Sequence, residues 1–204
     1  MMNTLTSTYC RELIQGFDEI SDDRKVVLNR LAELIRTKVE QKEEVNLIYI
    51  CTHNSRRSHF GQVWAALAAH YYMVPGISSF SGGTEATAFN PQAINALERV
   101  GMKVVKMNDD SNPEYHVHFS DEVNPVICFS KVYDHPVNPQ KDFIAIMTCS
   151  DAEENCPFIP GANHRIATTY EDPKLFDGTP QMESKYDERC RQIAMECFYV
   201  FSMI

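Results

Sequence analysis

The chain has 204 residues, which is long enough for one domain with a sizeable hydrophobic core. Its net charge of −9 argues against nucleic-acid binding, because a phosphate backbone is bound by a basic surface. There is no apolar run of about 18 residues and no signal-peptide pattern, so we expect neither a membrane span nor export. The seven cysteines are therefore expected to be reduced thiols in the cytoplasm, where pairing between them is transient and catalytic.

Helices and strands alternate along the chain. Apolar residues recur at helical spacing over 5–42, where Ser21 can cap a helix, and an apolar β-branched run over 45–51 predicts a buried strand. The next predicted elements are a helix over 57–72, a strand over 77–83, a helix over 90–101, a β-hairpin over 108–141, a strand over 142–149 and a helix over 181–203. This order is typical of an α/β fold with a mostly parallel sheet, in which ligands bind at the carboxyl ends of the strands.

The segment Cys-Thr-His-Asn-Ser-Arg-Arg-Ser, residues 51–58, connects the first predicted strand to the helix that follows it. Backbone N–H groups in such a turn converge on one point, and the helix dipole adds positive potential, so the turn can bind an oxyanion. Arg57 can donate two hydrogen bonds to that anion, while these donors and the Ser58 hydroxyl favour Cys51 as a nucleophilic thiolate. A lone cysteine more often packs as a small apolar residue, but the Cys-x5-Arg-Ser spacing between strand and helix favours catalysis.

This loop resembles the signature loop of the low-molecular-weight tyrosine phosphatase superfamily, C-x-x-N-x-x-R-S, which Asn54 also matches. The resemblance implies a four-stranded, mostly parallel sheet flanked by helices in a domain over 45–204. Residues 1–44 would then be an N-terminal helical extension, and the hairpin over about 108–141 an insertion. The oxyanion site implied by the resemblance consists of Thr52, His53, Asn54, Ser55, Arg56 and Arg57.

A phosphatase of this class needs a general acid to protonate the leaving oxygen, and the superfamily supplies it from an Asp-Pro pair on a late loop. Asp172-Pro173 is the candidate in this chain, and Glu171 is the alternative. An Asp-Pro pair alone more often marks an ordinary turn. This pair, however, lies after the last predicted strand and before the last predicted helix, so Asp172 is the predicted acid.

Two further cysteines, Cys149 and Cys156, are separated by acidic and helix-compatible residues. Zinc is disfavoured because His164 is the only other nearby ligand and the spacing fits no common finger. The pair could simply pack in the core or could be redox-active. The run Cys-Ser-Asp-Ala-Glu-Glu-Asn-Cys-Pro resembles the second and third catalytic cysteines of thioredoxin-coupled arsenate reductases, which share the phosphatase fold and loop.

That resemblance implies a thiol relay without a cofactor. Cys51 attacks arsenate, Cys149 then attacks Cys51 and expels arsenite, and Cys156 finally moves the disulfide outward, where thioredoxin reduces it. A helix over 149–156 would hold the last two cysteines about 10.5 Å apart, whereas a disulfide needs Cα atoms within about 7 Å. We therefore expect this segment to unwind during the last exchange.

Two other functions remain open. The first is a phosphatase that hydrolyses phosphotyrosine or a small phosphate ester through a phosphocysteine, with Cys149 and Cys156 only protecting Cys51 from oxidation. The second is a non-catalytic oxyanion sensor, which the presence of Cys51, Arg57 and Asp172 disfavours.

Some relatives hold potassium beside the loop with residues that match Asn54 and Ser81 and with an acid where this chain has Gln62. The neutral amide disfavours potassium, so no metal site is predicted. The N-terminal extension and the hairpin have no counterpart in the family core, and one interpretation of the extension is a helical pair at a homodimer interface. The remaining cysteines are predicted to be packing residues, namely Cys10, Cys128, Cys190 and Cys197.

Overall fold

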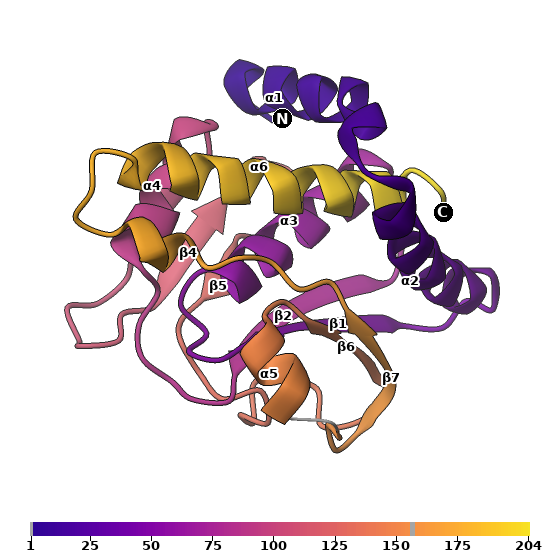
Figure 1. Cartoon of the computed structure of the whole chain (residues 1–204). Coiled ribbons are helices and arrows are strands. Elements are labelled where there is room, and N and C mark those ends of the chain that lie inside the picture. Colours follow the sequence, from indigo (N-terminus) through magenta and orange to yellow (C-terminus); the bar gives the residue numbers. More distant parts are fainter. Residues whose placement is uncertain (1, 156–157) are drawn as a thin grey trace.

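The structure is a computed structural model that describes residues 2–155 and 158–204. At its centre lies a four-stranded sheet with the strand order β2–β1–β6–β7, in which every neighbouring pair is parallel (Figure 1). The strands are β1 (Val45–Cys51), β2 (Ile77–Gly83), β6 (Phe143–Met147) and β7 (Ala162–Ala167). The predicted α/β class with a four-stranded parallel sheet is therefore confirmed.

The two faces of β1 pack into different apolar clusters because successive side chains of a strand point in opposite directions. Leu47 and Tyr49 lie in the larger cluster together with the helices α2, α3 and α6. Ile48 and Ile50 lie in a smaller cluster together with Cys51 and the short helix α5. These helices are α2 (Asp22–Glu40), α3 (Arg57–Tyr71), α5 (Ser150–Asn155) and α6 (Met182–Phe201). The sheet thus has helices on both faces.

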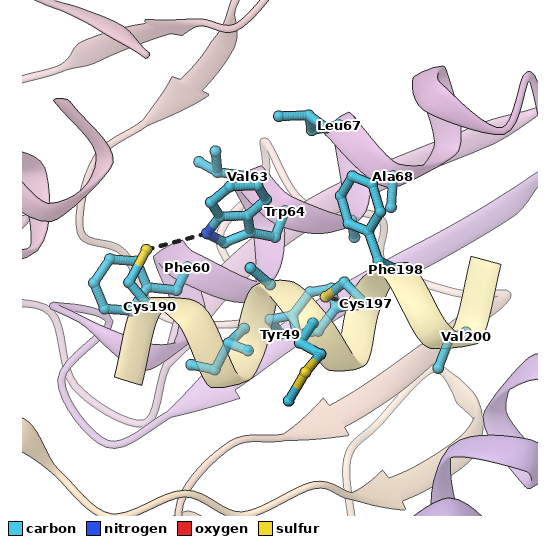
Figure 2. Packing of buried hydrophobic residues seen from close by; sticks show 14 of the residues in the cluster. Tyr49, Phe60, Val63, Trp64, Leu67, Ala68, Cys190, Cys197, Phe198 and Val200 are labelled. Carbon is cyan, nitrogen blue, oxygen red and sulfur yellow. Dashed lines mark hydrogen bonds between the residues drawn. The ribbon is translucent and has the colours of Figure 1, made fainter. Parts of the chain in front are cut away.

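Tight packing between β1, α3 and α6 fixes the position of α3, the helix that follows the loop after Cys51. Figure 2 shows Phe60 and Trp64 of α3 against α6, where the Trp64 indole N–H donates to the Cys190 sulfur at 3.2 Å. At Gly61, an added Cβ would lie 2.1 Å from the ring of Tyr49, so only glycine lets α3 approach β1 this closely. This contact sets the position of the N-terminus of α3 relative to the end of β1.

The helical structure predicted over 5–42 and the helix cap predicted at Ser21 are confirmed, but the helical segment is interrupted at its middle. The structure has two helices there, α1 (Thr4–Gln15) and α2, joined by the 3₁₀ turn η1 (Phe17–Glu19). Gly16 ends α1, and the Ser21 hydroxyl accepts the Arg24 N–H at 3.3 Å to begin α2. The break directs α1 along α6, whereas α2 runs on to contact β1 and β7 (Figure 1).

The predicted hairpin is confirmed as the antiparallel pair β4 (Tyr115–His118) and β5 (Val126–Cys128). A third strand, β3 (Lys103–Lys106), pairs with β4 and was not predicted, because four residues with two lysines give little strand signal. The helix α4 (Pro91–Arg99) precedes this small sheet. After β5, the chain returns to the main sheet, where the Gly83 N–H donates to the Lys131 carbonyl at 2.8 Å.

The strand β7 was also not predicted. Its sequence Ala-Asn-His-Arg-Ile-Ala contains one buried residue, Ile166, so it lacks the continuous apolar run of a central strand. It forms the edge of the sheet, where one side of the strand has no partner strand and polar residues are tolerated. From β7 the chain continues to the 3₁₀ turn η2 (Pro173–Phe176) and then to α6.

Four cysteines pack in the core, as predicted from the sequence. Cys10, Cys128, Cys190 and Cys197 are all at most 5% exposed. Burial raises the pKa of each of these thiols to about 12, because a thiolate is poorly solvated in an apolar interior. They are therefore protonated and inert at neutral pH.

The longest described helix, α6, has 20 residues and carries several charged side chains along its length. It crosses the molecule above α3 (Figure 1). In the ranges 2–155 and 158–204, none of the helices combines the length and the apolar character needed to cross a bilayer.

Candidate active site

The loop between β1 and α3 is pinned by the side chain of Asn54. This residue is buried and has a φ of 44°, a left-handed conformation that asparagine adopts more readily than most residues. Its amide nitrogen donates to the Ser58 hydroxyl at 2.8 Å, and its amide oxygen accepts the Lys131 backbone N–H at 2.9 Å. Asn54 thus ties the loop both to α3 and to the segment that follows β5.

Cys51 lies at the end of β1, at the base of this loop, and is only 3% exposed. Its sulfur lies 3.1 Å from the Ser58 hydroxyl oxygen. Because that oxygen already accepts a hydrogen bond from the Asn54 amide, the Ser58 O–H can donate to the sulfur. A hydrogen bond in this direction holds the Cys51 sulfur at the base of the loop.

The other loop residues predicted from the sequence are held by the segments that follow β2 and β5. The Glu85 N–H donates to the Thr52 carbonyl at 2.8 Å, and the Ser55 hydroxyl donates to the Ala88 carbonyl at 2.7 Å. The His53 carbonyl accepts the Ser130 hydroxyl at 2.9 Å. At Gly83, an added Cβ would lie 2.5 Å from the Thr52 carbonyl oxygen, so the close support of the loop requires glycine.

Arg57 begins α3 and brings the loop together with the predicted acid. Its Nη2 donates to Asp172 Oδ2 at 2.6 Å, and its Nη1 donates to the Tyr170 carbonyl at 2.9 Å. Its Nε is buried and has no hydrogen-bond partner among the described residues. The guanidinium therefore binds one carboxylate already and retains an unused donor, as expected of a group that exchanges partners with an incoming oxyanion.

Asp172 and Glu171 have different surroundings. Asp172 accepts a hydrogen bond from Arg57 and also accepts the Lys174 N–H at 3.0 Å, which fixes its carboxylate at the start of η2. The Glu171 side chain is 84% exposed and lies 3.5 Å from Arg189 of α6. The geometry therefore favours Asp172 over Glu171 as the acid.

The side chain of Arg56 forms hydrogen bonds with two residues that were not predicted from the sequence to belong to the site. Its Nε donates to the Tyr186 hydroxyl at 2.7 Å, and its Nη2 donates to Asp177 Oδ2 at 3.3 Å. The Tyr186 hydroxyl in turn donates to Asp177 Oδ1 at 2.8 Å. Arg56 thus links the loop to α6 and to the segment that carries Asp172, and no local motif marks either of its partners.

The structure places Cys149 beside the loop, although it is 97 positions from Thr52 in the sequence. The Cys149 sulfur is buried and lies 3.4 Å from the Thr52 hydroxyl oxygen. Cys149 and Cys51 belong to the same small apolar cluster. Cys156, the third cysteine of the predicted relay, lies outside the described residues, although the helix α5 that leads to it begins directly after Cys149.

The residues considered for potassium, Asn54, Ser81 and Gln62, form hydrogen bonds with other groups of the protein. The Ser81 hydroxyl donates to Gln62 Oε1 at 2.6 Å, and both polar ends of the Asn54 side chain are hydrogen-bonded. Lys131 is buried nearby, and burial lowers its pKa to about 8. Within 2–155 and 158–204, no group of three or more His, Cys, Asp or Glu side chains could hold a metal ion.

Curated arsenate reductases are similar to this chain in sequence. Arsenate reductase 2 of Staphylococcus epidermidis is 28% identical over 132 residues, which cover 64% of this chain and 80% of that protein. The arsenate reductase of Bacillus subtilis is 24% identical over 145 residues, which cover 71% of this chain and 86% of that protein. No family model matches the chain.

Solved structures share the fold. A low-molecular-weight phosphotyrosine phosphatase from Vibrio cholerae aligns with a TM-score of 0.52 at 11% identity, over 78% of this chain and 94% of its own. An arsenate reductase from Archaeoglobus fulgidus aligns with a TM-score of 0.51 at 14% identity, over 76% of this chain and 98% of its own. The chain thus has the fold of the low-molecular-weight phosphatases, with the loop that begins at Cys51 between β1 and α3. Its sequence is similar to the arsenate reductases of the two species above.

Proposed function

We propose that this protein is an arsenate reductase that uses Cys51, Cys149 and Cys156 as a thiol relay and is recycled by thioredoxin. The observation that carries the proposal is the position of the Cys149 sulfur, 3.4 Å from the hydroxyl of Thr52 and in the same cluster as Cys51. A second thiol beside the nucleophile is what a reductase needs and a phosphatase does not. The sequence similarity to curated arsenate reductases supports the same function.

The first step is binding and attack. Arsenate is a tetrahedral oxyanion, so the loop N–H groups and Arg57 bind it, and Arg57 exchanges the Asp172 carboxylate for arsenate oxygens. Attack of the Cys51 thiolate on arsenic forms the S–As bond and breaks an As–O bond. The departing oxygen takes a proton, which Asp172 is placed to deliver in its protonated form, and leaves as water.

The second step is the reduction itself. Attack of Cys149 on the Cys51 sulfur forms a disulfide and returns the electron pair of the S–As bond to arsenic. Arsenic is thereby reduced by two electrons and leaves as arsenite, while two thiols are oxidised. Cys156 then attacks Cys149 and releases the Cys51 thiolate, and the outer disulfide is reduced by thioredoxin. Because α5 is helical in the reduced protein, this last exchange requires the helix to open.

Arsenate-dependent oxidation of NADPH tests the function when the protein is coupled to thioredoxin and thioredoxin reductase. We expect continuous NADPH consumption that needs both arsenate and thioredoxin, with arsenite formed in equal amount. Phosphate should compete with arsenate because it binds the same loop. Absence of arsenate-dependent consumption, with phosphate-ester hydrolysis intact, would contradict the proposal and favour the phosphatase.

Phosphate-ester hydrolysis is the second candidate activity, because the structure holds the Asp172 carboxylate 2.6 Å from the Arg57 guanidinium, next to the loop. Loss of a general acid usually costs about 100-fold or more. We therefore expect Asp172→Asn to slow hydrolysis of an aryl phosphate by at least that factor and to slow arsenate reduction less. The matched control is Glu171→Gln, because the Glu171 side chain is 84% exposed and pairs with Arg189. A larger phosphatase defect in Glu171→Gln than in Asp172→Asn would mean that the other carboxylate is the acid.

A further inference from the structure

An arginine of the N-terminal extension lies against the segment that leads from β7 to Asp172. Arg24 is in the first turn of α2, and its Nη2 donates to the Thr168 carbonyl at 2.9 Å. Its guanidinium carbon also lies 4.8 Å from the ring centroid of Tyr170, in a cation–π contact. The extension therefore contacts this segment at two points.

The same arginine is bound by a buried carboxylate of α6. Arg24 donates to both oxygens of Glu196, at 3.0 and 2.7 Å, and the Glu196 side chain is 4% exposed. The Tyr170 hydroxyl donates to Glu196 Oε2 at 2.7 Å. Burial and the neighbouring Glu196 raise the pKa of Tyr170 well above its usual range, so this hydroxyl remains a donor. Arg24 and Glu196 thus hold Tyr170 by its side chain.

The backbone of the same segment carries the partners of Arg57. The Tyr170 N–H donates to the Thr148 carbonyl at 3.1 Å, which fixes the segment beside the end of β6. The Tyr170 carbonyl accepts Arg57 Nη1 at 2.9 Å, and Asp172 accepts Arg57 Nη2 at 2.6 Å. The orientation of the Arg57 guanidinium therefore depends on where this segment lies.

We propose that Arg24 is a positioning residue of the oxyanion site, so that the N-terminal extension completes the site from outside the phosphatase core. The inference deepens the proposed function and rests on its assignment of Arg57 to the oxyanion. Arg24 balances the buried charge of Glu196, and together they fix Tyr170. The carbonyl of Tyr170 then fixes the guanidinium that binds the oxyanion.

Loss of Arg24 is expected to change the orientation of the Arg57 guanidinium, and catalysis is sensitive to that orientation. Small misplacements of a group that binds the transition state can cost about 100-fold, and the loss of an indirect support is expected to cost about tenfold. We therefore expect Arg24→Met to lower kcat for an aryl phosphate and for arsenate by about tenfold and to weaken inorganic phosphate binding. Arg24→Lys retains the charge beside Glu196 but not the paired donors, so it should recover only part of the loss.

A matched control separates positioning from stability. Arg191 of α6 pairs with Glu19 of η1 at 2.8 Å, so Arg191→Met also removes an ion pair between the extension and α6. None of the described contacts of Arg191 reaches the segment from Thr168 to Asp172. We expect its kcat and phosphate binding to match those of the unchanged protein. Tyr170→Phe is the second test variant, because it leaves the Arg24–Glu196 pair in place and removes only the link from Glu196 to the segment.

The experiment compares full-length Arg24→Met, Tyr170→Phe and Arg191→Met after circular dichroism has shown which of them are folded. The readouts are kcat and KM, inorganic phosphate affinity by calorimetry, and the rates at which iodoacetate and iodoacetamide alkylate Cys51. The anionic reagent depends on Arg57 and the neutral one does not, so the ratio of the two rates reports the guanidinium orientation. We expect the ratio to fall several-fold in Arg24→Met and less in Tyr170→Phe, and to be unchanged in Arg191→Met.

The inference is overturned when folded Arg24→Met gives the same kcat and the same alkylation ratio as Arg191→Met. Where Arg24→Met does not fold, an unchanged alkylation ratio in Tyr170→Phe overturns it. The alkylation ratio requires no turnover of arsenate. Failure of the unchanged protein to reduce arsenate would therefore contradict the proposed function. The alkylation ratio would still test whether Arg24 positions Arg57.

Discussion

Replacing Cys51 with serine is expected to abolish both arsenate reduction and phosphate-ester hydrolysis. A serine hydroxyl is not ionised at neutral pH, and neither the Ser58 hydrogen bond nor Arg57 can make it a comparable nucleophile. Loss of a catalytic nucleophile commonly costs more than about 10⁴-fold in kcat. The measurement is the rate of each reaction, with mass spectrometry to exclude residual cysteine-containing protein.

The binding function of the loop should survive this substitution. The N–H groups of the loop and the Arg57 guanidinium remain in place, so Cys51→Ser should still bind inorganic phosphate. Cys10→Ser provides the control, because Cys10 is buried in α1 and does not belong to the site. Turnover by Cys51→Ser within tenfold of the unchanged protein, with either substrate, would show that Cys51 is not the nucleophile.

The two outer cysteines are expected to separate the two candidate activities. Cys149→Ser and Cys156→Ser should retain phosphate-ester hydrolysis, because water releases a phosphocysteine without a second thiol. Neither variant should sustain arsenate reduction, because each turnover needs two electrons from a thiol pair and a disulfide that thioredoxin can reach. The measurement is arsenite formed per molecule of protein, over one turnover and over many.

The single turnovers of these variants should differ. In Cys156→Ser, Cys149 is still present beside Thr52, so one equivalent of arsenite should form and a Cys51–Cys149 disulfide should accumulate. In Cys149→Ser, even this first equivalent should be missing unless a small thiol is added. Mass spectrometry of the arsenate-treated proteins after digestion identifies the disulfide. Continuous turnover of Cys156→Ser with thioredoxin would exclude the relay and favour the phosphatase.

Local sequence patterns were sufficient for the elements that carry the loop. The apolar run before Cys51 predicted β1, and the helical spacing of apolar residues from Arg57 onward predicted α3. Both signals are local, because the residues that a buried strand or helix face needs lie only a few positions apart in the sequence. The spacing from Cys51 to Ser58 predicted a loop between a strand and a helix, and the structure has this strand–loop–helix arrangement. Oxyanion binding by the loop stays a prediction. The sequence by itself therefore determined the α/β class and the loop.

Local patterns were not sufficient where tertiary contacts decide the structure. Gly16 interrupts one long helical pattern, and the break is stabilised by the packing of α1 along α6. The strand β7 has one buried residue, so its apolar signal is weak, and its pairing with β6 makes it a strand. In both cases the element depends on a neighbour that is distant in the sequence.

The same holds for the contacts that support the site. Cys149 lies beside Thr52 because β6 pairs with β1 in parallel, which brings the ends of both strands to one edge of the sheet. The Arg24–Glu196 pair joins residues 172 positions apart. A single sequence shows that each of these residues is charged or reactive but does not show which of them meet. Only the tertiary structure decided those partners, because a polar side chain in a folded core bonds to whichever group the packing of helices and strands brings within reach.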